Sequence, residues 1–429
     1  MKKKYRIILY TSIFLLCVVA SIILVVKKSN SVYEEESKPK VVKHKSMLSM
    51  NLEQTAGAGD YKTVTQSKWP TEGYKFNAEL SRCENGSTLS WDDTKKAVIV
   101  SGNLSDKCYV YFDIYQPTLA EYIKSQYTGT QGENNIYYHD SDLANGAGDN
   151  SYRYAGANPN NFVCFGSDTS PCPTDNLYRI IGVFGENYHG VTGKQLVKLI
   201  KYDYMTTDEL GTDGDYSQTY KEWGMDSTYK GTYGDGERIG VYYWNYKATG
   251  SATNTWSTSL LNKTNLNTNF INNIGTTWAN KIATVTWKVG GNTYANISDV
   301  VPATTYQNEI VNPVTTNTTD NATTYSAKIG LMYVSDYGFA ASPDAWTLTM
   351  SSYNNTTATN NNWMYMGLYE WTISRDAGGS GAAFFVSYVG LVNGFSVDDF
   401  SGVRPSFNLE SSVRYVSGSG SMSDPIVIN

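Results

Sequence analysis

The sequence is poor in the side chains that most metal and nucleophilic sites use. Its 429 residues include only three His and five Cys, so few ligands are left for a metal centre. Charged residues make up 17%, whereas ordinary globular domains have roughly 25%, and the net charge is −6. No cluster of Lys and Arg occurs past residue 45, which argues against nucleic-acid binding.

Aromatic residues are abundant instead. The chain holds 35 Tyr and 10 Trp, and aromatics make up 14% of it. A chain that never packs lacks such residues, so disorder throughout is excluded. The length leaves room for two or three domains. The composition predicts a secreted or surface protein that is rich in β-structure.

An apolar segment follows the basic N-terminus. Residues 2–6 read KKKYR, and an uncharged run of twenty residues extends from Ile7 to Val26. At about 1.5 Å per residue this run spans about 30 Å, the thickness of a bilayer's hydrocarbon core. Basic residues ahead of the run keep the N-terminus cytoplasmic. We therefore predict a cytoplasmic tip and transmembrane signal anchor over 1–27, with the remainder outside the cell membrane. A cleaved signal peptide is the alternative.

Charged and then Gly-rich residues follow, and we predict a flexible stalk over 28–68. Residues 69–115 are predicted to form a small β module, because STLSW and AVIVSG flank a DDTKK turn as in a hairpin. An exported chain permits disulfides, and four cysteines allow three pairings. Their order along the chain favours Cys83–Cys108 and Cys164–Cys172. Their spacings fit no zinc site.

The rest of the chain, 116–429, is predicted to be one large domain. Apolar residues recur at helical spacing over 117–127 and again over 255–282, where Gly275 is a candidate break. Residues 176–184 and 194–203 read as paired strands, and 327–340 as a strand and turn. Residues 341–363 are Asn- and Thr-rich and are predicted to be a polar loop.

Several segments of this domain resemble a known family. They are WTISR (371–375), AAFFVSYVG (382–390), GVRPSFNL (402–409) and the terminal SGSGSMSDPIVI. They are similar to bacterial surface domains of the C-type-lectin-like fold, which is shared with formylglycine-generating enzymes and the variable proteins of diversity-generating retroelements. The resemblance covers about 116–429. It implies an α+β fold, with a mixed sheet, two or so helices and long loops, and it implies little about function.

The comparison with enzymes of that fold argues against catalysis. Formylglycine-generating enzymes need a late pair of reactive cysteines, and this sequence has no Cys after Cys172. Iron-dependent relatives need a His-rich site, whereas this domain holds only His139 and His189. No G-x-S-x-G nucleophile motif occurs. We expect no enzyme activity.

No cofactor is expected either, and Ca²⁺ is the minor alternative. Calcium-dependent lectins use an E-P-N or Q-P-D tripeptide together with W-N-D. The nearest segments here are Ser342-Pro343-Asp344 and Val397-Asp398-Asp399, a loose match.

Two arginines are candidates for binding an anionic ligand. Arg404 lies in the G-V-R-P segment and Arg375 ends W-T-I-S-R. The structural alternative is preferred for both, with Arg404 paired inside the domain and Arg375 paired with Asp376 or Asp399.

Aromatic side chains are the better candidates for a binding surface, because Tyr and Trp make contacts at a low cost in conformational entropy. The candidates cluster late in the chain: Trp363, Tyr365, Tyr369, Phe385, Tyr388 and Phe395. Trp371, which opens a strand-like segment, is expected to be core. Alternation predicts that one of Phe384 and Phe385 faces outward.

The sequence thus predicts a membrane-anchored surface protein whose lectin-like head binds an external glycan or protein, as in adhesion. The alternative is a structural or assembly subunit of the cell envelope without a small-molecule ligand.

Overall fold

The structure is a computed structural model. It describes residues 48–429 except 66–67, 72, 186–192, 213–221, 225–228, 235–236, 248 and 314–323, and describes only the backbone of 222–224. The predicted membrane segment and residues 28–47 of the predicted stalk lie outside the described residues. Within the described part, no helix has the length and apolar character needed to cross a bilayer. The chain divides into two compact units between Tyr115 and Gln116.

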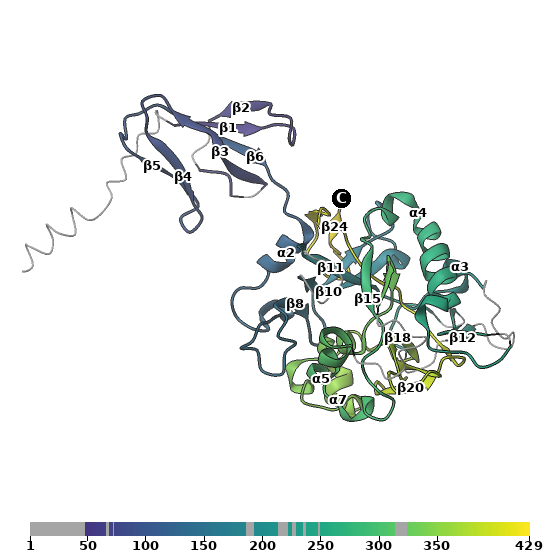
Figure 1. The fold of residues 1–429 in the computed structure, drawn as a ribbon. Coiled ribbons are helices and arrows are strands. Elements are labelled where there is room, and N and C mark those ends of the chain that lie inside the picture. Colours follow the sequence, from purple (N-terminus) through teal and green to yellow (C-terminus); the bar gives the residue numbers. More distant parts are fainter. Residues whose placement is uncertain are drawn as a thin grey trace, which may run out of the picture. The chain divides into compact units, whose positions relative to one another are not determined.

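Over its described residues, 48–115 with short gaps, the smaller unit is built from strands (Figure 1). Its strands are β1 (Leu48–Glu53), β2 (Tyr61–Val64), β3 (Tyr74–Cys83), β4 (Thr88–Asp92), β5 (Ala97–Ser101) and β6 (Cys108–Ile114). One sheet has the order β2-β1-β6-β3, and β4 and β5 form the predicted hairpin. Met50, Leu52, Val98, Val110 and Phe112 make its core.

The predicted stalk is wrong over residues 48–64, because β1 and β2 belong to this sheet. β1 pairs in parallel with β6 and antiparallel with β2. Apolar residues alternate in its sequence, LSMNLE, so that Met50 and Leu52 enter the core. Alternation of this kind is the signature of a half-buried strand. A soluble fragment that starts at residue 69 would therefore lack two strands of the sheet.

Both predicted disulfides are present. Cys83–Cys108 joins the end of β3 to the start of β6, with a Cα–Cα distance of 3.9 Å. Cys164–Cys172 closes a short loop in the larger unit, with a Cα–Cα distance of 5.8 Å. Each bond lies within one unit, so neither ties the two units together.

The larger unit is a mixed α+β structure with several sheets and few helices, as the sequence predicts at this level. Its strands are β7 (Ile136–His139), β8 (Ser151–Tyr154), β9 (Phe162–Cys164), β10 (Leu177–Phe184), β11 (Leu196–Lys201), β12 (Glu222–Gly224), β13 (Arg238–Gly240), β14 (Tyr242–Tyr243), β15 (Val285–Lys288), β16 (Thr324–Ala327), β17 (Ile329–Gly330), β18 (Glu370–Arg375), β19 (Ala382–Val386), β20 (Val392–Ser396), β21 (Phe400–Ser401), β22 (Ser406–Asn408), β23 (Tyr415–Ser417) and β24 (Val427–Ile428).

Its helices are short. The α-helices are α2 (Leu119–Ser125), α3 (Thr207–Leu210), α4 (Ile271–Ala279), α5 (Pro302–Tyr306), α6 (Val334–Ala340) and α7 (Thr356–Asn360). Two π-helical segments, η4 (Leu261–Phe270) and η6 (Gln307–Val311), run directly into or out of them. The 3₁₀ turns are η1 (Glu133–Asn135), η2 (Thr174–Asn176), η3 (Trp256–Thr258), η5 (Ile297–Asp299), η7 (Pro343–Ala345) and η8 (Met350–Ser352).

The main sheet of this unit has the order β17-β22-β11-β10-β8-β7, with β9 also pairing with β10. The predicted strand pair is confirmed, because β10 and β11 lie antiparallel and are buried along their whole length. A smaller sheet, β18-β19-β20, carries Trp371, Phe384, Phe385 and Phe395. In Figure 1, α3 and α4 lie together on one side of the unit and α5 and α7 together at another.

Local sequence signals account for two helices. Thr118 and Glu121 form a capping box at the start of α2, which confirms the helix predicted over 117–127. The segment 255–282, whose apolar residues recur at helical spacing, forms η4 followed by α4, and the helix is interrupted at the predicted break. Gly275 has φ 77° and ψ 162°, a conformation that favours glycine.

The prediction of a strand and turn over 327–340 is wrong in its second half, which is α6. The backbone N–H groups of Val334 and Ser335 donate to the Glu309 carboxylate, at 3.2 and 3.0 Å. The N–H of Tyr333 donates to Asp336 at 2.9 Å. Buried carboxylates thus satisfy the N–H groups that a helix leaves unpaired at its start. Since Glu309 comes from a distant segment, local patterning did not indicate this helix.

Candidate functional site

The β18-β19-β20 sheet carries Phe385 and Phe395, and Tyr369 and Tyr388 lie just outside the ends of β18 and β19. Trp371 on β18 pairs with Phe385 on β19, and Ala383 on β19 pairs with Phe395 on β20. Directly paired residues and every second residue along a strand share one side of a sheet. Trp371, Phe385 and Phe395 therefore lie on the same side.

Rings on that side form a continuous series that runs outward from the core. Trp371 is fully buried, as predicted, and its ring centroid lies 6.2 Å from that of Phe395. Phe385 contacts Phe395 at 5.0 Å and Tyr369 at 5.5 Å, and Tyr369 contacts Tyr388 at 5.3 Å. Tyr388 is 43% exposed and Phe395 is 36% exposed. We call Tyr369, Phe385, Tyr388 and Phe395 the aromatic face.

Two predicted binding residues do not belong to this face. Trp363 is buried in a second core cluster, and its Nε1–H donates to the Tyr154 carbonyl at 2.8 Å. Tyr365 is also buried there, and its hydroxyl donates to the Tyr388 carbonyl at 2.6 Å. Trp363 is therefore a core residue, and Tyr365 supports the backbone of Tyr388 from within.

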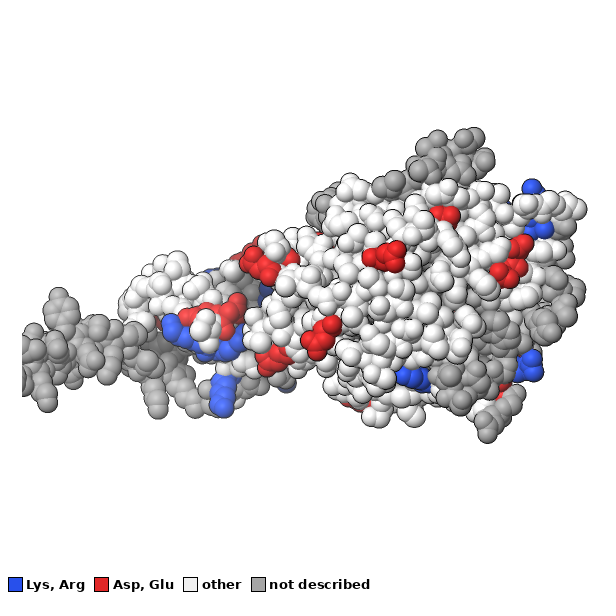
Figure 2. All heavy atoms as spheres, turned by 90° about the horizontal axis from the view of Figure 1, so that it is seen from below, with Lys and Arg blue, Asp and Glu red and all other residues white. Residues whose placement is uncertain are grey.

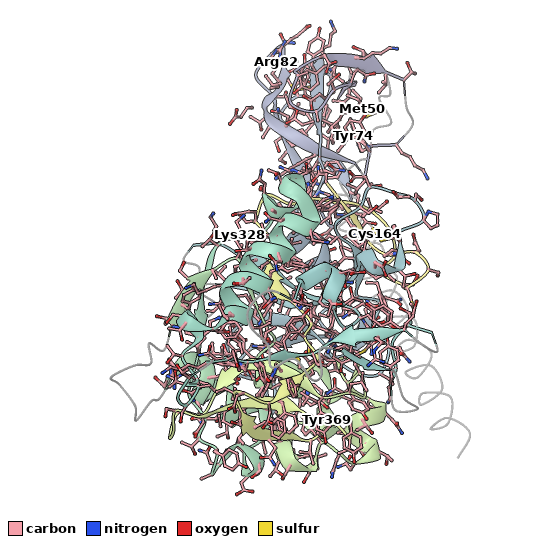
Figure 3. The ribbon with its side chains drawn as sticks, turned by 90° about the vertical axis from the view of Figure 1, so that its right-hand side faces the viewer. Met50, Tyr74, Arg82, Cys164, Lys328 and Tyr369 are labelled. Atoms are coloured by element: carbon pink, nitrogen blue, oxygen red, sulfur yellow. A yellow bond between two sulfur atoms is a disulfide. The ribbon has the colours of Figure 1, made fainter. Side chains whose placement is uncertain are left out.

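The expectation that one of Phe384 and Phe385 faces outward is wrong as well. The two side chains point to opposite sides of β19, but both are buried, because a core cluster lies on each side. Figure 3 shows Tyr369 among these strands, toward the end of the larger unit opposite Cys164. The disulfide loop at Cys164 is thus remote from the aromatic face.

The two candidate arginines serve the interior. The Arg404 guanidinium donates to both oxygens of the Glu370 carboxylate, at 2.8 and 2.9 Å, and to the Met364 carbonyl at 2.7 Å. Both side chains of this pair are buried. Arg375 is also buried, and its guanidinium donates to the carbonyls of Val289 and Asp376, at 2.8 and 3.3 Å. Neither guanidinium is placed to meet an external anion.

The candidate calcium ligands do not converge. Asp344 lies in η7, whereas Asp398 and Asp399 follow β20. The Ser396 hydroxyl donates to Asp398, and burial together with the charge of Asp398 raises the pKa of Asp399. In the part of the chain that the structure describes, no group of three or more His, Cys, Asp or Glu could hold a metal ion.

The larger unit also contains a cleft of about 800 Å³ that no sequence pattern predicted. Its walls carry several carboxylates, amides and hydroxyls, with Tyr178 and Phe270 at its base and Met422 near its rim. The carboxylate of Glu209 lies in this cleft and pairs with the buried Lys201 at 3.3 Å. The polar wall residues are Thr174, Asp175, Asn176, Thr206, Asp208, Glu209, Thr232, Glu237, Arg238 and Asn273. They come from segments far apart in the sequence, so no local motif could indicate the cleft.

Charged side chains are sparse on one side of the larger unit. On the side drawn in Figure 2, most of its described surface is neither acidic nor basic. This agrees with the low fraction of charged residues and leaves hydroxyl, amide and aromatic groups as the main surface chemistry.

Arg153 on β8 and Lys198 on β11 belong to a buried network of charges. Arg153 pairs with Asp149 at 2.8 Å, and Lys198 pairs with Asp336. Nearby, Glu309 accepts the hydroxyl hydrogen of Ser374 in addition to the two N–H groups of α6. Burial nevertheless raises the pKa of Glu309 to about 7, because these hydrogen bonds only partly offset the loss of water.

The contribution of Glu309 to the free energy of unfolding should therefore fall as the pH rises through 7. The folded state holds the Glu309 proton more tightly than the unfolded state, whose pKa is near 4.5, so this contribution is fully present below that value and is lost by pH 8. We expect a loss on the order of 2 kcal/mol, measured by urea denaturation between pH 5 and 8.

The Glu309→Gln variant should lack this fall, so its stability relative to the wild type should rise between pH 5 and 8, whereas the exposed Glu133→Gln should follow the wild type. The difference between profiles isolates Glu309 from His139, whose pKa burial lowers and whose effect has the opposite sign. Parallel profiles for the wild type and Glu309→Gln would contradict the assignment.

Comparisons of the chain with protein-family models, with curated proteins and with solved structures find no match.

Proposed function

We propose that this chain is a membrane-anchored bacterial surface protein whose larger unit binds an external glycan or protein through the aromatic face. The uncharged segment from Ile7 to Val26 would supply the single-pass anchor and leave the head outside the cell. The sparse charge of the chain favours such a ligand over nucleic acid. The proposed activity is binding without catalysis and without a cofactor.

A C-type-lectin-like fold for the larger unit is part of this proposal. Its two most specific sequence segments, WTISR and GVRP, lie side by side, because Trp371 N–H donates to the Gly402 carbonyl at 3.1 Å and Arg404 pairs with Glu370. A mixed α+β architecture of several small sheets and few helices supports the same fold.

The observation that carries the function is the aromatic face. Its rings are held at one end by the buried Trp371 and reach solvent at Tyr388 and Phe395. A partly solvent-exposed Tyr offers an apolar ring together with a hydroxyl, the combination found at many protein interfaces. Rings braced by other rings also lose little freedom when a ligand stacks on them.

The experiment is a glycan and protein array probed with the full chain in detergent, repeated with Tyr388→Ala and Phe395→Ala. Truncation at a binding hot spot costs about 2 kcal/mol, so each variant should bind the array ligand roughly thirty-fold more weakly. Tyr294→Ala is the matched control. Tyr294 is 52% exposed, and it packs against Gly394, which points to the other side of β20 from Phe395.

Two results would overturn the proposal. One is an array ligand whose binding falls equally in all three variants. The other is no ligand at all, together with self-association in sedimentation that Tyr388→Ala or Phe395→Ala abolishes. That second result would favour the assembly subunit of the envelope.

A further inference from the structure

An amine and a carboxyl group meet in the interior of the larger unit. Lys198 on β11 donates to the Oδ2 atom of Asp336 on α6, although the two residues are 138 positions apart in the sequence. Lys198 is 1% exposed and Asp336 is 2% exposed. The Lys198 Nζ also lies 4.2, 5.2 and 5.9 Å from the ring centroids of Tyr333, Trp287 and Phe184. These rings are buried as well, so the pair is shielded from bulk water.

The two oxygens of the Asp336 carboxylate have different surroundings. Oδ2 accepts from Lys198 and, at 2.9 Å, from the N–H of Tyr333. Oδ1 is buried and accepts no hydrogen bond from any residue that the structure describes. The Nη1 atom of Arg153 lies 4.0 Å from Oδ1, and it too is buried without a hydrogen-bond partner in the described part of the chain. A positively charged donor is therefore available beside the oxygen that Lys198 leaves unused.

A second buried carboxylate, that of Glu309, lies beside Asp336. Asp336 accepts the N–H of Tyr333, and Glu309 accepts the next two N–H groups along the chain, so the two carboxylates cap consecutive N–H groups at the start of α6. Burial raises the pKa of Glu309 to about 7, whereas burial lowers the pKa of Lys198. Glu309 can therefore take up a proton and release it again, and Lys198 gives up a proton more readily than an exposed lysine does.

We propose that Lys198 and Asp336 are joined by an intramolecular isopeptide bond, which the folded chain forms without a co-reactant. The deprotonated Nζ attacks Cγ of Asp336 and forms the C–N bond, while the C=O electron pair moves onto Oδ1, beside Arg153. The ammonium gives up two protons in all, and Oδ2 receives both, one of them through Glu309. The Cγ–Oδ2 bond breaks with its electron pair on oxygen, and Oδ2 leaves as water. One ammonium and one carboxylate thus become one amide and one water, so atoms and charge balance.

The surroundings favour the amide over the ion pair. Removing two charges from water is expensive, and their mutual attraction in the interior often fails to repay that cost. The amide removes both charges at once. Arg153 remains paired with Asp149 at 2.8 Å, so no unpaired charge is left behind. The guanidinium of Arg153 also stabilises the negative charge that develops on Oδ1 during the attack.

The bond ties β11, a strand of the main sheet, to the start of α6. A covalent link between residues so far apart restricts the unfolded chain, as a disulfide does. The two disulfides close much shorter separations, of 25 and 8 residues. The isopeptide bond also resists reduction, which a disulfide does not. The reaction occurs once per chain without turnover of a substrate, and it goes beyond the binding function proposed above.

The test is peptide mapping of the full chain after reduction, denaturation and digestion with trypsin. Trypsin cleaves after free Lys and Arg, so a linked Lys198 should yield peptide 195–201 joined to peptide 329–375. The mass of the joined pair should be lower than the sum of the two peptides by the mass of one water. The intact chain should likewise lack one water when its mass is compared with that of Lys198→Met, after allowance for the substitution.

Lys201→Met is the matched control, because Lys201 is another buried lysine of β11 that pairs with a carboxylate, that of Glu209. By intact mass, Lys201→Met should still lack one water, whereas Lys198→Met and Asp336→Leu should have the full masses of their sequences. In Glu309→Gln, bond formation after cell-free synthesis should slow about a hundredfold or more, the usual contribution of general acid–base catalysis. The exposed Glu133→Gln should form the bond at the wild-type rate.

Separate peptides 195–198 and 329–375 from the wild type would overturn the proposal, and this result does not depend on whether any variant folds. A link from Lys198 to another carboxyl group, or a loss of water that persists in Lys198→Met, would overturn it too. An unchanged rate in Glu309→Gln would remove the role given to Glu309.

Discussion

Replacing Arg404 by Met should lower the free energy of unfolding by about 3–5 kcal/mol, one of the two largest effects that we expect. The substitution leaves the Glu370 carboxylate buried without the guanidinium that donates to both of its oxygens. The Met364 carbonyl loses its partner too. Urea denaturation of the full chain measures the loss, with Glu370→Leu as the reciprocal variant.

The double variant Arg404→Met/Glu370→Leu should be more stable than either single variant, because an apolar pair removes both buried charges at once. The exposed pair Lys194–Glu410, at 3.9 Å, supplies the control. Lys194→Met should cost no more than about 1 kcal/mol, as is usual for ion pairs in water. Equal losses in Arg404→Met and Lys194→Met would contradict the structural role of Arg404.

Features that depend on neighbouring residues could be predicted from the sequence. The β4–β5 hairpin follows from two alternating strands around a polar turn, and α2 follows from apolar spacing with Thr118 and Glu121 at its start. The disulfides follow from order along the chain, because each pair closes a short local loop. Such signals lie within the segment that forms the feature.

Features that depend on distant segments could not be predicted. α6 begins where it does because Glu309 accepts its first N–H groups, and no local signal reports that contact. The segment 341–363, predicted to be a loop, holds three short helices and buries Trp346, Met350 and Tyr353. The prediction failed because these residues stand among polar neighbours in the sequence. The large cleft is likewise assembled from separated segments.

For the candidate binding residues, too, local patterns were predictable and contacts with distant segments were not. Strand alternation correctly separates Phe384 from Phe385, but it cannot tell whether the second side of a sheet faces water or another cluster. For Trp363 the deciding contacts are the Tyr154 carbonyl and the Arg179 guanidinium, which lies 4.7 Å from its ring. Both partners lie far from Trp363 in the sequence. The aromatic-rich segment alone therefore could not show which rings are buried and which are exposed.

Trp371→Ala should destabilise the protein by about 3–5 kcal/mol, whereas Tyr388→Ala should change stability by less than about 1 kcal/mol. Trp371 is fully buried, its Nε1–H donates to the Tyr242 carbonyl at 2.8 Å, and its removal leaves a cavity beside Phe385. Tyr388 is 43% exposed, and among the aromatic rings that the structure describes it contacts that of Tyr369 alone.

The measurement is the shift in melting temperature of the full chain, with Phe395→Ala beside Tyr388→Ala. Phe395 contacts Phe385 and Trp371 and is 36% exposed, so its loss should fall between the two extremes. A folded Tyr388→Ala variant is what makes a loss of ligand binding meaningful, because binding then falls without loss of the fold. Should Tyr388→Ala and Phe395→Ala both destabilise the protein as strongly as Trp371→Ala, the aromatic face would be packing, and the proposed binding function would lose its main support.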